Sequence, residues 1–172
     1  MVGQGRSLSD LSGKGGFALA KKRPITLLER REIEATFFKT LLGPLLEKIS
    51  EEDLREAVGK ALCQAAHEAG QAAARDGNSL EDFKKVIRGW AEGGALEMDE
   101  LEDSPDCLRF NVTRCAYAEL YERLGLKEWG TVLSCDRDFA VLEGFNDGLE
   151  LTRPKTLMED KEHCNYCYRP KK

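Results

Sequence analysis

Apolar residues in the first half of the chain recur at intervals of three and four, the spacing that lines one face of a helix. The first such stripe consists of Ile33, Phe37, Phe38, Leu41, Leu42, Leu45, Leu46 and Ile49. Pro44 falls inside this stripe. We expect a kink or break there, because proline lacks a backbone donor and clashes with the preceding turn.

Two further helices are predicted from their start and stop signals. Ser50 can cap a helix, Asp53 follows three residues later, and the alanine-rich run after them ends at Gly77. Ser79 and Asp82 repeat the same start signal. The helix after Ser79 would bury a face made of Phe83, Val86, Ile87 and Trp90.

The period changes to two in the second half of the chain. Apolar and polar residues alternate over 96–99 and over 108–112, and the turn sequence 104–106 lies between them, which predicts a hairpin. Alternation returns over 149–151 and 164–168 as two more strands. Short helices are expected between the strand pairs, marked by Tyr117, Leu120, Tyr121 and Leu124, by Leu126, Trp129 and Leu133, and by Phe139 and Leu142.

These elements predict an α+β fold: N-terminal helices followed by a small antiparallel sheet of about four strands with short helices interspersed. Residues 1–23 are rich in Gly, Ser and Lys, which predicts a flexible leader. Residues 24–172 are expected to form a single domain.

Composition narrows the classes of function. The chain has 172 residues, 41% hydrophobic and 33% charged, and a net charge of −5 without a basic cluster, so we expect no nucleic-acid partner. No apolar run approaches the ~20 residues that span a bilayer, and no secretory signal is recognisable, so we expect a cytoplasmic protein without a membrane partner. Its six cysteines should then be reduced rather than paired in disulfides.

Two cysteines lie where helices are expected to begin. Thr113 is a candidate N-cap, which would place Cys115 in the first helical turn, where the helix dipole and Arg114 favour a thiolate. Cys135 repeats this arrangement before the helix that carries Phe139. Each cysteine could equally be a small buried apolar residue.

Other residues able to take part in chemistry are few. Asp136, Asp138 and Glu143 follow Cys135, and we single out Asp138 as a partner for a cationic group or a proton, with helix capping as the alternative. His163 is one of only two histidines. A metal site is a further alternative, but its four candidate ligands have no short zinc spacing: Cys115, Cys135, His163 and Cys164.

Several runs in the second half, taken together, are similar to a known family. They are residues 110–119, 134–140, 143–146, 151–153, 156–159 and 163–164. The chain thereby resembles the L-2-amino-thiazoline-4-carboxylic acid hydrolase family, a name applied widely to bacterial sequences. The resemblance implies an enzyme of cysteine metabolism that hydrolyses a carbon–nitrogen bond of a cyclic amidine, opening a thiazoline ring towards a carbamoyl-cysteine.

The resemblance also implies which positions form the site. The positions carried over are Asn111, Thr113, Cys115, Tyr117, Asp138, Phe139, Glu143, His163 and Cys164. With the residue chemistry, they give a catalytic set of Cys115, Asp138, His163 and Cys135. The substrate-binding set is Asn111, Thr113, Arg114, Tyr117, Phe139, Glu143 and Cys164.

The mechanism expected from these residues is nucleophilic catalysis. A Cys115 thiolate would attack the amidine carbon, His163 or an acidic neighbour would protonate the leaving group, and Arg114 would hold the substrate carboxylate. We expect a small-molecule substrate, no cofactor and no metal, and leave a homo-oligomer open. Two alternatives stand beside this: a metal-dependent hydrolase with Cys and His ligands, and a non-enzymatic small-molecule or thiol-reactive binding protein.

Overall fold

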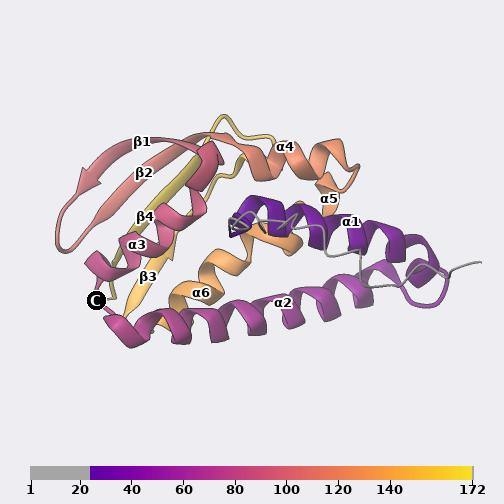
Figure 1. Ribbon diagram of the computed structural model, residues 1–172, viewed down its shortest axis with the longest axis horizontal. Coiled ribbons are helices and arrows are strands. Elements are labelled where there is room, and N and C mark those ends of the chain that lie inside the picture. The colour runs from indigo at the N-terminus through magenta and orange to yellow at the C-terminus, as the bar shows by residue number, and fades with distance from the viewer. Residues whose placement is uncertain (1–23, 172) are drawn as a thin grey trace, which may run out of the picture.

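The computed structural model describes residues 24–171, in which long N-terminal helices precede a four-stranded antiparallel sheet with short helices between its strands (Figure 1). The predicted α+β class is therefore confirmed, as is the antiparallel sheet. The predicted leader, residues 1–23, lies outside the described residues, and the single domain over 24–172 stays a prediction.

Helix α1 (Leu27–Leu46) begins with a capping box in which the Thr26 hydroxyl accepts from the Glu29 amide. It continues through Pro44 and ends two residues later, so the break expected at the proline comes slightly after it. One face packs on the domain, where Phe38 meets Trp129 with ring centroids 5.1 Å apart. The opposite face, which includes Phe37, is exposed.

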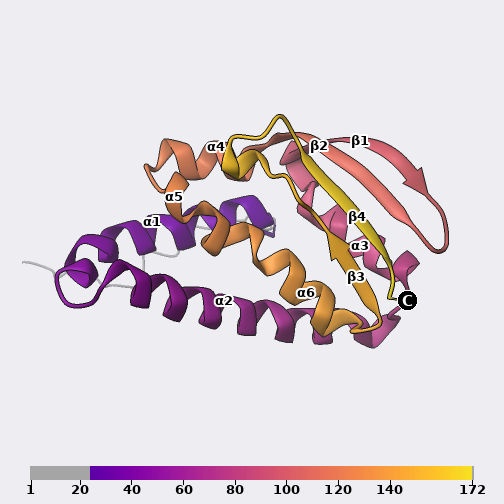
Figure 2. The same cartoon turned by 180° about the vertical axis from the view of Figure 1, so that it is seen from behind.

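Helices α2 (Glu51–Ala73) and α3 (Leu80–Trp90) begin at the predicted caps, Ser50 and Ser79. Helix α2 runs beside α6 (Arg137–Phe145) at very short range (Figure 2). A Cβ added at Gly70 would overlap the α6 backbone, and one added at Gly144 would overlap the carbonyl of His67. Glycine at these two positions therefore sets the separation of the two helices.

The sheet contains the four predicted strands in the order β1-β2-β4-β3. Their bounds are β1 (Leu96–Asp103), β2 (Leu108–Cys115), β3 (Leu149–Thr152) and β4 (Cys164–Pro170). β1 and β2 form the predicted hairpin, whose pairing extends to Leu96 opposite Cys115. β4 is central because it pairs with β2 on one side and with β3 on the other.

One core lies between the sheet and the two helices that cover a single face of it, α3 and α6 (Figure 1). The ring of Phe83 on α3 lies 5.0 Å from Phe145 on α6 and 5.4 Å from Tyr168 on β4. Phe110 on β2 stacks on Tyr166 at 4.9 Å. Alternation along β4 therefore directs Cys164, Tyr166 and Tyr168 towards the helices, as its sequence pattern indicates.

A second core joins α1 and α2 to the segment between β2 and β3. This segment consists of α4 (Ala116–Arg123), α5 (Lys127–Gly130), a π-helical turn (Thr131–Cys135) and α6. Its central residues are Tyr121, Leu126 and Trp129, all buried. The two cores share Cys115 and Leu96, so the end of β2 is the point where the sheet meets the helical layer.

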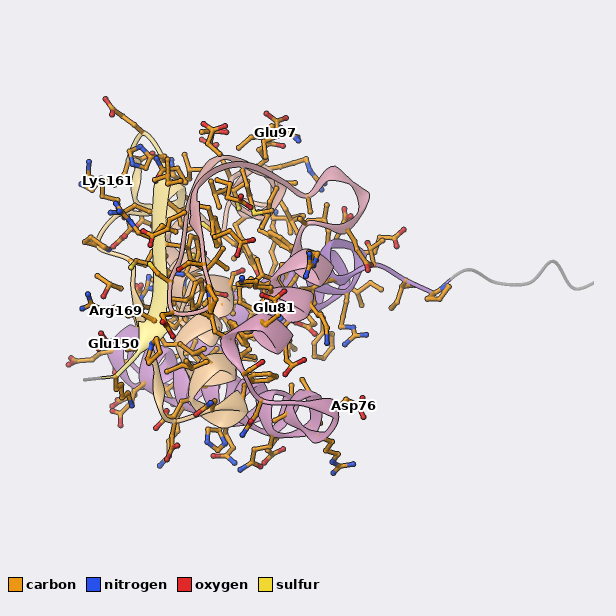
Figure 3. All side chains as sticks on the ribbon, turned by 90° about the vertical axis from the view of Figure 1, so that its left-hand side faces the viewer. Asp76, Glu81, Glu97, Glu150, Lys161 and Arg169 are labelled. Atoms are coloured by element: carbon orange, nitrogen blue, oxygen red, sulfur yellow. The ribbon has the colours of Figure 1, made fainter. Side chains whose placement is uncertain are left out.

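The outer side of the sheet carries charged residues, among them Glu150 and Arg169, which face each other across β3 and β4 (Figure 3). Their ion pair measures 2.5 Å between Oε1 and Nε. Within residues 24–171, none of the helices combines the length and apolar character needed to cross a membrane.

Candidate active site

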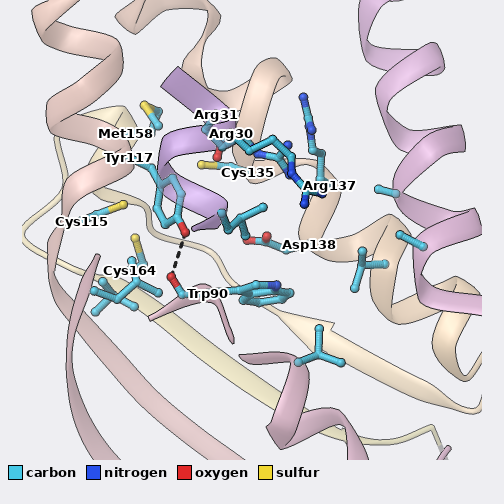
Figure 4. Close-up of a pocket in the computed structure, with 18 of the residues that line it drawn as sticks. Arg30, Arg31, Trp90, Cys115, Tyr117, Cys135, Arg137, Asp138, Met158 and Cys164 are labelled. Carbon is cyan, nitrogen blue, oxygen red and sulfur yellow. Dashed lines mark hydrogen bonds between the residues drawn. The ribbon is translucent and has the colours of Figure 1, made fainter. Parts of the chain in front are cut away.

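A cleft of about 360 Å³ lies between α1, α2, α3 and the start of α6. Its walls include the Tyr117 ring and the Trp90 ring, and the Tyr117 hydroxyl donates to the Trp90 carbonyl at 2.8 Å (Figure 4). This hydrogen bond ties α4 to the end of α3. The cleft therefore lies where the sheet, the N-terminal helices and the inserted helices all meet.

Three thiols and the carboxyl of Asp138 lie together in the lining of this cleft. Cys115 ends β2, Cys135 ends the π-helical turn, Asp138 lies in the first turn of α6, and Cys164 begins β4. Figure 4 shows the three sulfur atoms around the Tyr117 ring. A single cleft thus brings together three residues predicted from their neighbours in sequence, Cys115, Cys135 and Asp138, and two taken from the family resemblance, Tyr117 and Cys164.

The local structure at Cys115 differs from the prediction. β2 extends to Cys115 because Leu96 and Glu97 pair with it and with Arg114, so Thr113 is a strand residue and Cys115 itself precedes α4. Burial raises the pKa of the Cys115 thiol to about 11, although the Ala118 and Tyr117 amides favour the thiolate. Burial of Cys115 therefore favours the thiol over the thiolate that the sequence predicted.

The helix predicted after Cys135 is present as α6, but Cys135 lies in the π-helical turn that leads into it and not at a free helix N-terminus. Asp136, which follows it, is already in right-handed helical conformation, so the chain runs from the π-helical turn into α6 without a free N-terminus. Burial raises the pKa of the Cys135 thiol well above its ordinary value, and Asp138 raises it further. The π-helical turn nevertheless has a consequence, since it directs Ser134 and Cys135 into the cleft.

The carboxyl of Asp138 is held in place by two donors, which both contact one of its oxygens. Arg153 Nη1 donates to Asp138 Oδ2 at 2.5 Å, and the Tyr166 hydroxyl donates to the same oxygen at 2.8 Å. Arg153 Nη1 also lies 3.2 Å from the Cys135 carbonyl oxygen. Among the described residues, no donor contacts the second oxygen, Oδ1, which leaves it available to a ligand.

Burial raises the pKa of Asp138 to about 6, despite the opposing effects of Arg153 and Tyr166. Its side chain is only 18% exposed, and that of Arg153 only 3%. A carboxyl with a pKa near neutrality can both accept and return a proton under ordinary conditions, which suits a general base. This property suits Asp138 for the proton transfer that the sequence analysis assigned to His163 or an acidic neighbour.

The end of the cleft next to α1 is basic. Arg30, Arg31 and Glu34 of α1 line it together with Arg137 of α6 (Figure 4). Arg31 and Arg137 both contact Glu34 Oε2, at 2.7 Å and 3.2 Å. These residues lie outside the region that resembled a family in sequence, apart from Arg137, and no local pattern in the sequence singled them out.

Six predicted site residues do not line the cleft. They are Asn111, Thr113, Arg114, Phe139, Glu143 and His163. Arg114 is exposed and pairs with Glu119 at 2.6 Å, away from the lining residues. Phe139 contacts the site indirectly, because its ring packs 4.9 Å from the guanidinium of Arg153, the residue that holds Asp138.

The remaining candidate ligands are dispersed. His163 precedes β4 and lies outside the cleft that Cys115, Cys135 and Cys164 share. Among the residues that the structure describes, no three His, Cys, Asp or Glu side chains are grouped as a metal site. Cys63, Cys107 and Cys167 also lie outside the lining of the cleft.

Sequence analysis missed Arg153 and Tyr166, which hold the reactive carboxyl. Arg153 was part of the family resemblance but had no assigned role, and Tyr166 was read only as a strand residue. The signal that was present is the alternation along β4, which directs Tyr166 to the same side of the strand as Cys164. Their contact with Asp138 depends on how β3 and β4 approach α6, which no local pattern contains.

The chain is similar to two solved structures. One is the phenol-responsive sensory domain of the transcription activator PoxR with phenol, with a TM-score of 0.51, 12% identity, and coverage of 87% of this chain and 77% of that one. The other is a trafficking protein particle complex subunit 3 from Naegleria fowleri covalently bound to palmitic acid, with a TM-score of 0.48, 11% identity, and coverage of 84% and 96%. At such identities the likeness concerns the fold alone.

No curated protein matches this chain. The sequence model of one family, described as L-2-amino-thiazoline-4-carboxylic acid hydrolase, matches residues 30–168. The match covers most of the chain, including both the N-terminal helices and the four strands. The resemblance seen in the second half of the sequence is thus confirmed and extends to the first: the chain belongs to the L-2-amino-thiazoline-4-carboxylic acid hydrolase family.

Proposed function

We propose that this protein is a hydrolase that opens a cyclic amidine at a carbon–nitrogen bond, with Cys115 as nucleophile and Asp138 as general base. The observation that carries the proposal is the shared cleft of Cys115 and Asp138, with the pKa of Asp138 raised to about 6 by burial. Membership of the family supports the reaction class. His163, which lies outside the cleft lining, has no step in this version.

The base is needed because the Cys115 thiol is a weak nucleophile in its protonated form. Its pKa of about 11 leaves it neutral near pH 7, so the proton must leave as sulfur attacks. Asp138, ionised above about pH 6, has an oxygen free to take that proton directly or through a water molecule. The same carboxylate can pair with the amidinium of a bound substrate.

The bond changes balance with one water molecule. The Cys115 sulfur adds to the amidine carbon, the ring carbon–nitrogen bond breaks, and the ring nitrogen leaves with the electron pair and the proton that Asp138 accepted. Water then adds to the same carbon, giving one proton to Asp138, and the bond from carbon to Cys115 breaks. The Cys115 thiolate takes that proton back from Asp138, the remaining hydroxyl proton passes to the freed amine as the carbonyl forms, and a carbamoyl product is released.

The decisive experiment is mass-spectrometric screening of thiazolines and related cyclic amidines for products heavier by one water. Cys115→Ser should reduce turnover by at least about a thousandfold. Cys107→Ser is the matched control, because Cys107 lies outside the cleft and should leave turnover unchanged. Undiminished turnover in Cys115→Ser would overturn the assignment of the nucleophile.

A second candidate function is a small-molecule binding protein without turnover. It is favoured by the raised pKa values of all three cleft thiols, which keep them protonated and unreactive. The PoxR sensory domain, which shares the fold, was solved with phenol, so the same architecture holds a small ligand there. Tight binding of an amidine with no product by mass spectrometry would select this candidate.

Elemental analysis of protein purified without added metal distinguishes a metal-dependent hydrolase from the thiol hydrolase and from the binding protein. Stoichiometric zinc that is lost in Cys115→Ser or Cys164→Ser would favour ligation by these thiols. Retention of full turnover after dialysis against a chelator would favour the thiol mechanism proposed here.

A further inference from the structure

The basic end of the cleft has more positive than negative charge. Arg31 and Arg137 share a single carboxylate, that of Glu34, although their side chains are only 15% and 12% exposed. Arg30 lines the same end and forms no ion pair with any described residue. Three guanidinium groups and one carboxylate, that of Glu34, therefore line this end of the cleft.

Arg137 shows the consequence of this imbalance. Its Nε atom is buried and has no hydrogen-bond partner among the described residues. Burial lowers the pKa of Arg137, and the neighbouring charge of Arg31 lowers it further. A buried donor without an acceptor is costly, so an arriving anion would gain hydrogen bonds that Glu34 alone does not satisfy.

The cleft also continues along α2, away from the arginines. Ala65, Ala69 and Ala73 line it on one face of α2, and Val86 and Trp90 of α3 lie at its far end. The first and last of these alanines are eight positions apart on the helix, a length of about 12 Å at 1.5 Å per residue. A single five-membered ring with a carboxylate spans roughly four bonds of about 1.5 Å, or about 6 Å, and would leave this apolar part empty.

We propose that the cleft binds an amphipathic carboxylate, whose charged group lies among Arg30, Arg31 and Arg137 and whose apolar group extends along the α2 alanines towards Val86. The inference deepens the proposed function and rests on it for the reactive end: the substrate would be an amidine carboxylate with an apolar substituent, larger than the bare ring. Glu34 then occupies the anion site in the absence of ligand and competes with it.

The test uses inert straight-chain carboxylates, from acetate to octanoate, titrated into the full chain by isothermal titration calorimetry, with octanamide as the uncharged comparison. Affinity should rise with chain length by up to about fourfold per methylene, because each buried methylene contributes to burial of apolar area. Octanoate should bind at least about tenfold more tightly than octanamide. Equal affinity for the two, or no dependence on chain length, would overturn the proposal.

Variants at the charged end should change affinity in opposite directions. Arg137→Gln should weaken octanoate about tenfold and leave octanamide unaffected, and Arg30→Gln, at an exposed position, provides the same test if the first variant unfolds. Glu34→Gln should strengthen octanoate, because the competing carboxylate is gone. Arg114→Gln, whose side chain pairs with Glu119 outside the cleft, is the matched control and should change nothing.

Variants along α2 test the apolar end. Ala69→Leu should reduce the affinity for octanoate several-fold and leave acetate unchanged, because its added atoms occupy the apolar part of the cleft. Ala72→Leu, on the same helix but outside the cleft lining, is the control. If Ala69→Leu acts no differently from Ala72→Leu, the proposed position of the apolar group is wrong.

These measurements need no turnover, so the two proposals fail separately. The protein could bind octanoate in a way that depends on Arg137 and Ala69 and yet hydrolyse no cyclic amidine. That result would contradict the proposed hydrolase activity and support the amphipathic ligand. Hydrolysis of an unsubstituted thiazoline carboxylate without any affinity for octanoate would do the reverse.

Discussion

Arg153 Nη1 donates to Asp138 Oδ2 at 2.5 Å, and this contact fixes the position of the Asp138 carboxyl in the cleft. Arg153 follows β3 and Asp138 lies on α6, so the contact joins the sheet to the helix that covers it. The Arg153 guanidinium is also packed 4.9 Å from the Phe139 ring and 5.3 Å from the Tyr166 ring. Its position is therefore held by aromatic contacts as well as by charge.

Activity should depend on pH through Asp138. Because the pKa of Asp138 is raised to about 6, the carboxylate form needed as base is lost below that value, and kcat/KM should fall about tenfold per pH unit below about 6. Asp138→Asn should lower kcat by about 100-fold to 10,000-fold. A pH–rate profile of thiazoline hydrolysis measures both, and a profile that stays flat from pH 7 to pH 4.5 would contradict the assignment.

Ionisation of Asp138, which activity requires, should lower the stability of the fold. The unfolded Asp138 carboxyl releases its proton near 3.8, whereas the folded one keeps it until about pH 6, so its contribution to stability is lost as pH rises through this window. The difference in unfolding free energy between wild type and Asp138→Asn should therefore fall by up to about 3 kcal/mol between pH 3 and pH 7. Urea denaturation at several pH values measures it.

Removing the charge of Arg153 should lower the free energy of unfolding more above pH 6 than below it. Arg153→Met keeps much of the volume but leaves the Asp138 carboxylate buried and unpaired, so we expect a loss of about 3–5 kcal/mol at pH 7.5. At pH 5 the carboxyl is protonated and the loss should shrink. The acid limb of the activity profile should also move to higher pH. Arg114→Met, which breaks an exposed ion pair, should cost at most about 1 kcal/mol at either pH.

The close approach of α2 and α6 should be sensitive to one methyl group. Gly144→Ala places a Cβ against the carbonyl of His67, and the resulting overpacking should destabilise the protein by about 1–3 kcal/mol or more. Gly89→Ala is the control, because a Cβ there meets nothing within 4 Å and alanine favours a helix; it should stabilise by up to about 1 kcal/mol. Thermal unfolding distinguishes the two directions.

Removing the hydroxyl group from either of two tyrosines on β4 should change the stability of the protein, in opposite directions for the two residues. The Tyr168 hydroxyl is buried and has no partner among the described residues, so Tyr168→Phe should stabilise by about 1 kcal/mol. The Tyr166 hydroxyl donates to Asp138 at 2.8 Å, so Tyr166→Phe should destabilise by about 1.5–3 kcal/mol above pH 6. Equal effects in urea denaturation would contradict this difference.

The sequence by itself determined the elements that depend on near neighbours. Ser50 and Ser79 cap helices because their hydroxyls accept from amides three residues away, and such signals are complete within one turn. The alternation around Phe110 and Tyr168 likewise gave the strands and the face that each buries. Local interactions of this kind are encoded where they occur along the chain.

Only the tertiary structure decided how these elements combine into a site. Pairing of Leu96 with Cys115 extended β2 past the predicted cap at Thr113, because hydrogen bonds to a neighbouring strand outweighed a local helix signal. Burial raised the pKa of the Cys115 thiol and of Asp138, and burial depends on every element packed around them. The convergence of α1 arginines, β4 and α6 on one cleft is set by long-range packing, which no local pattern specifies.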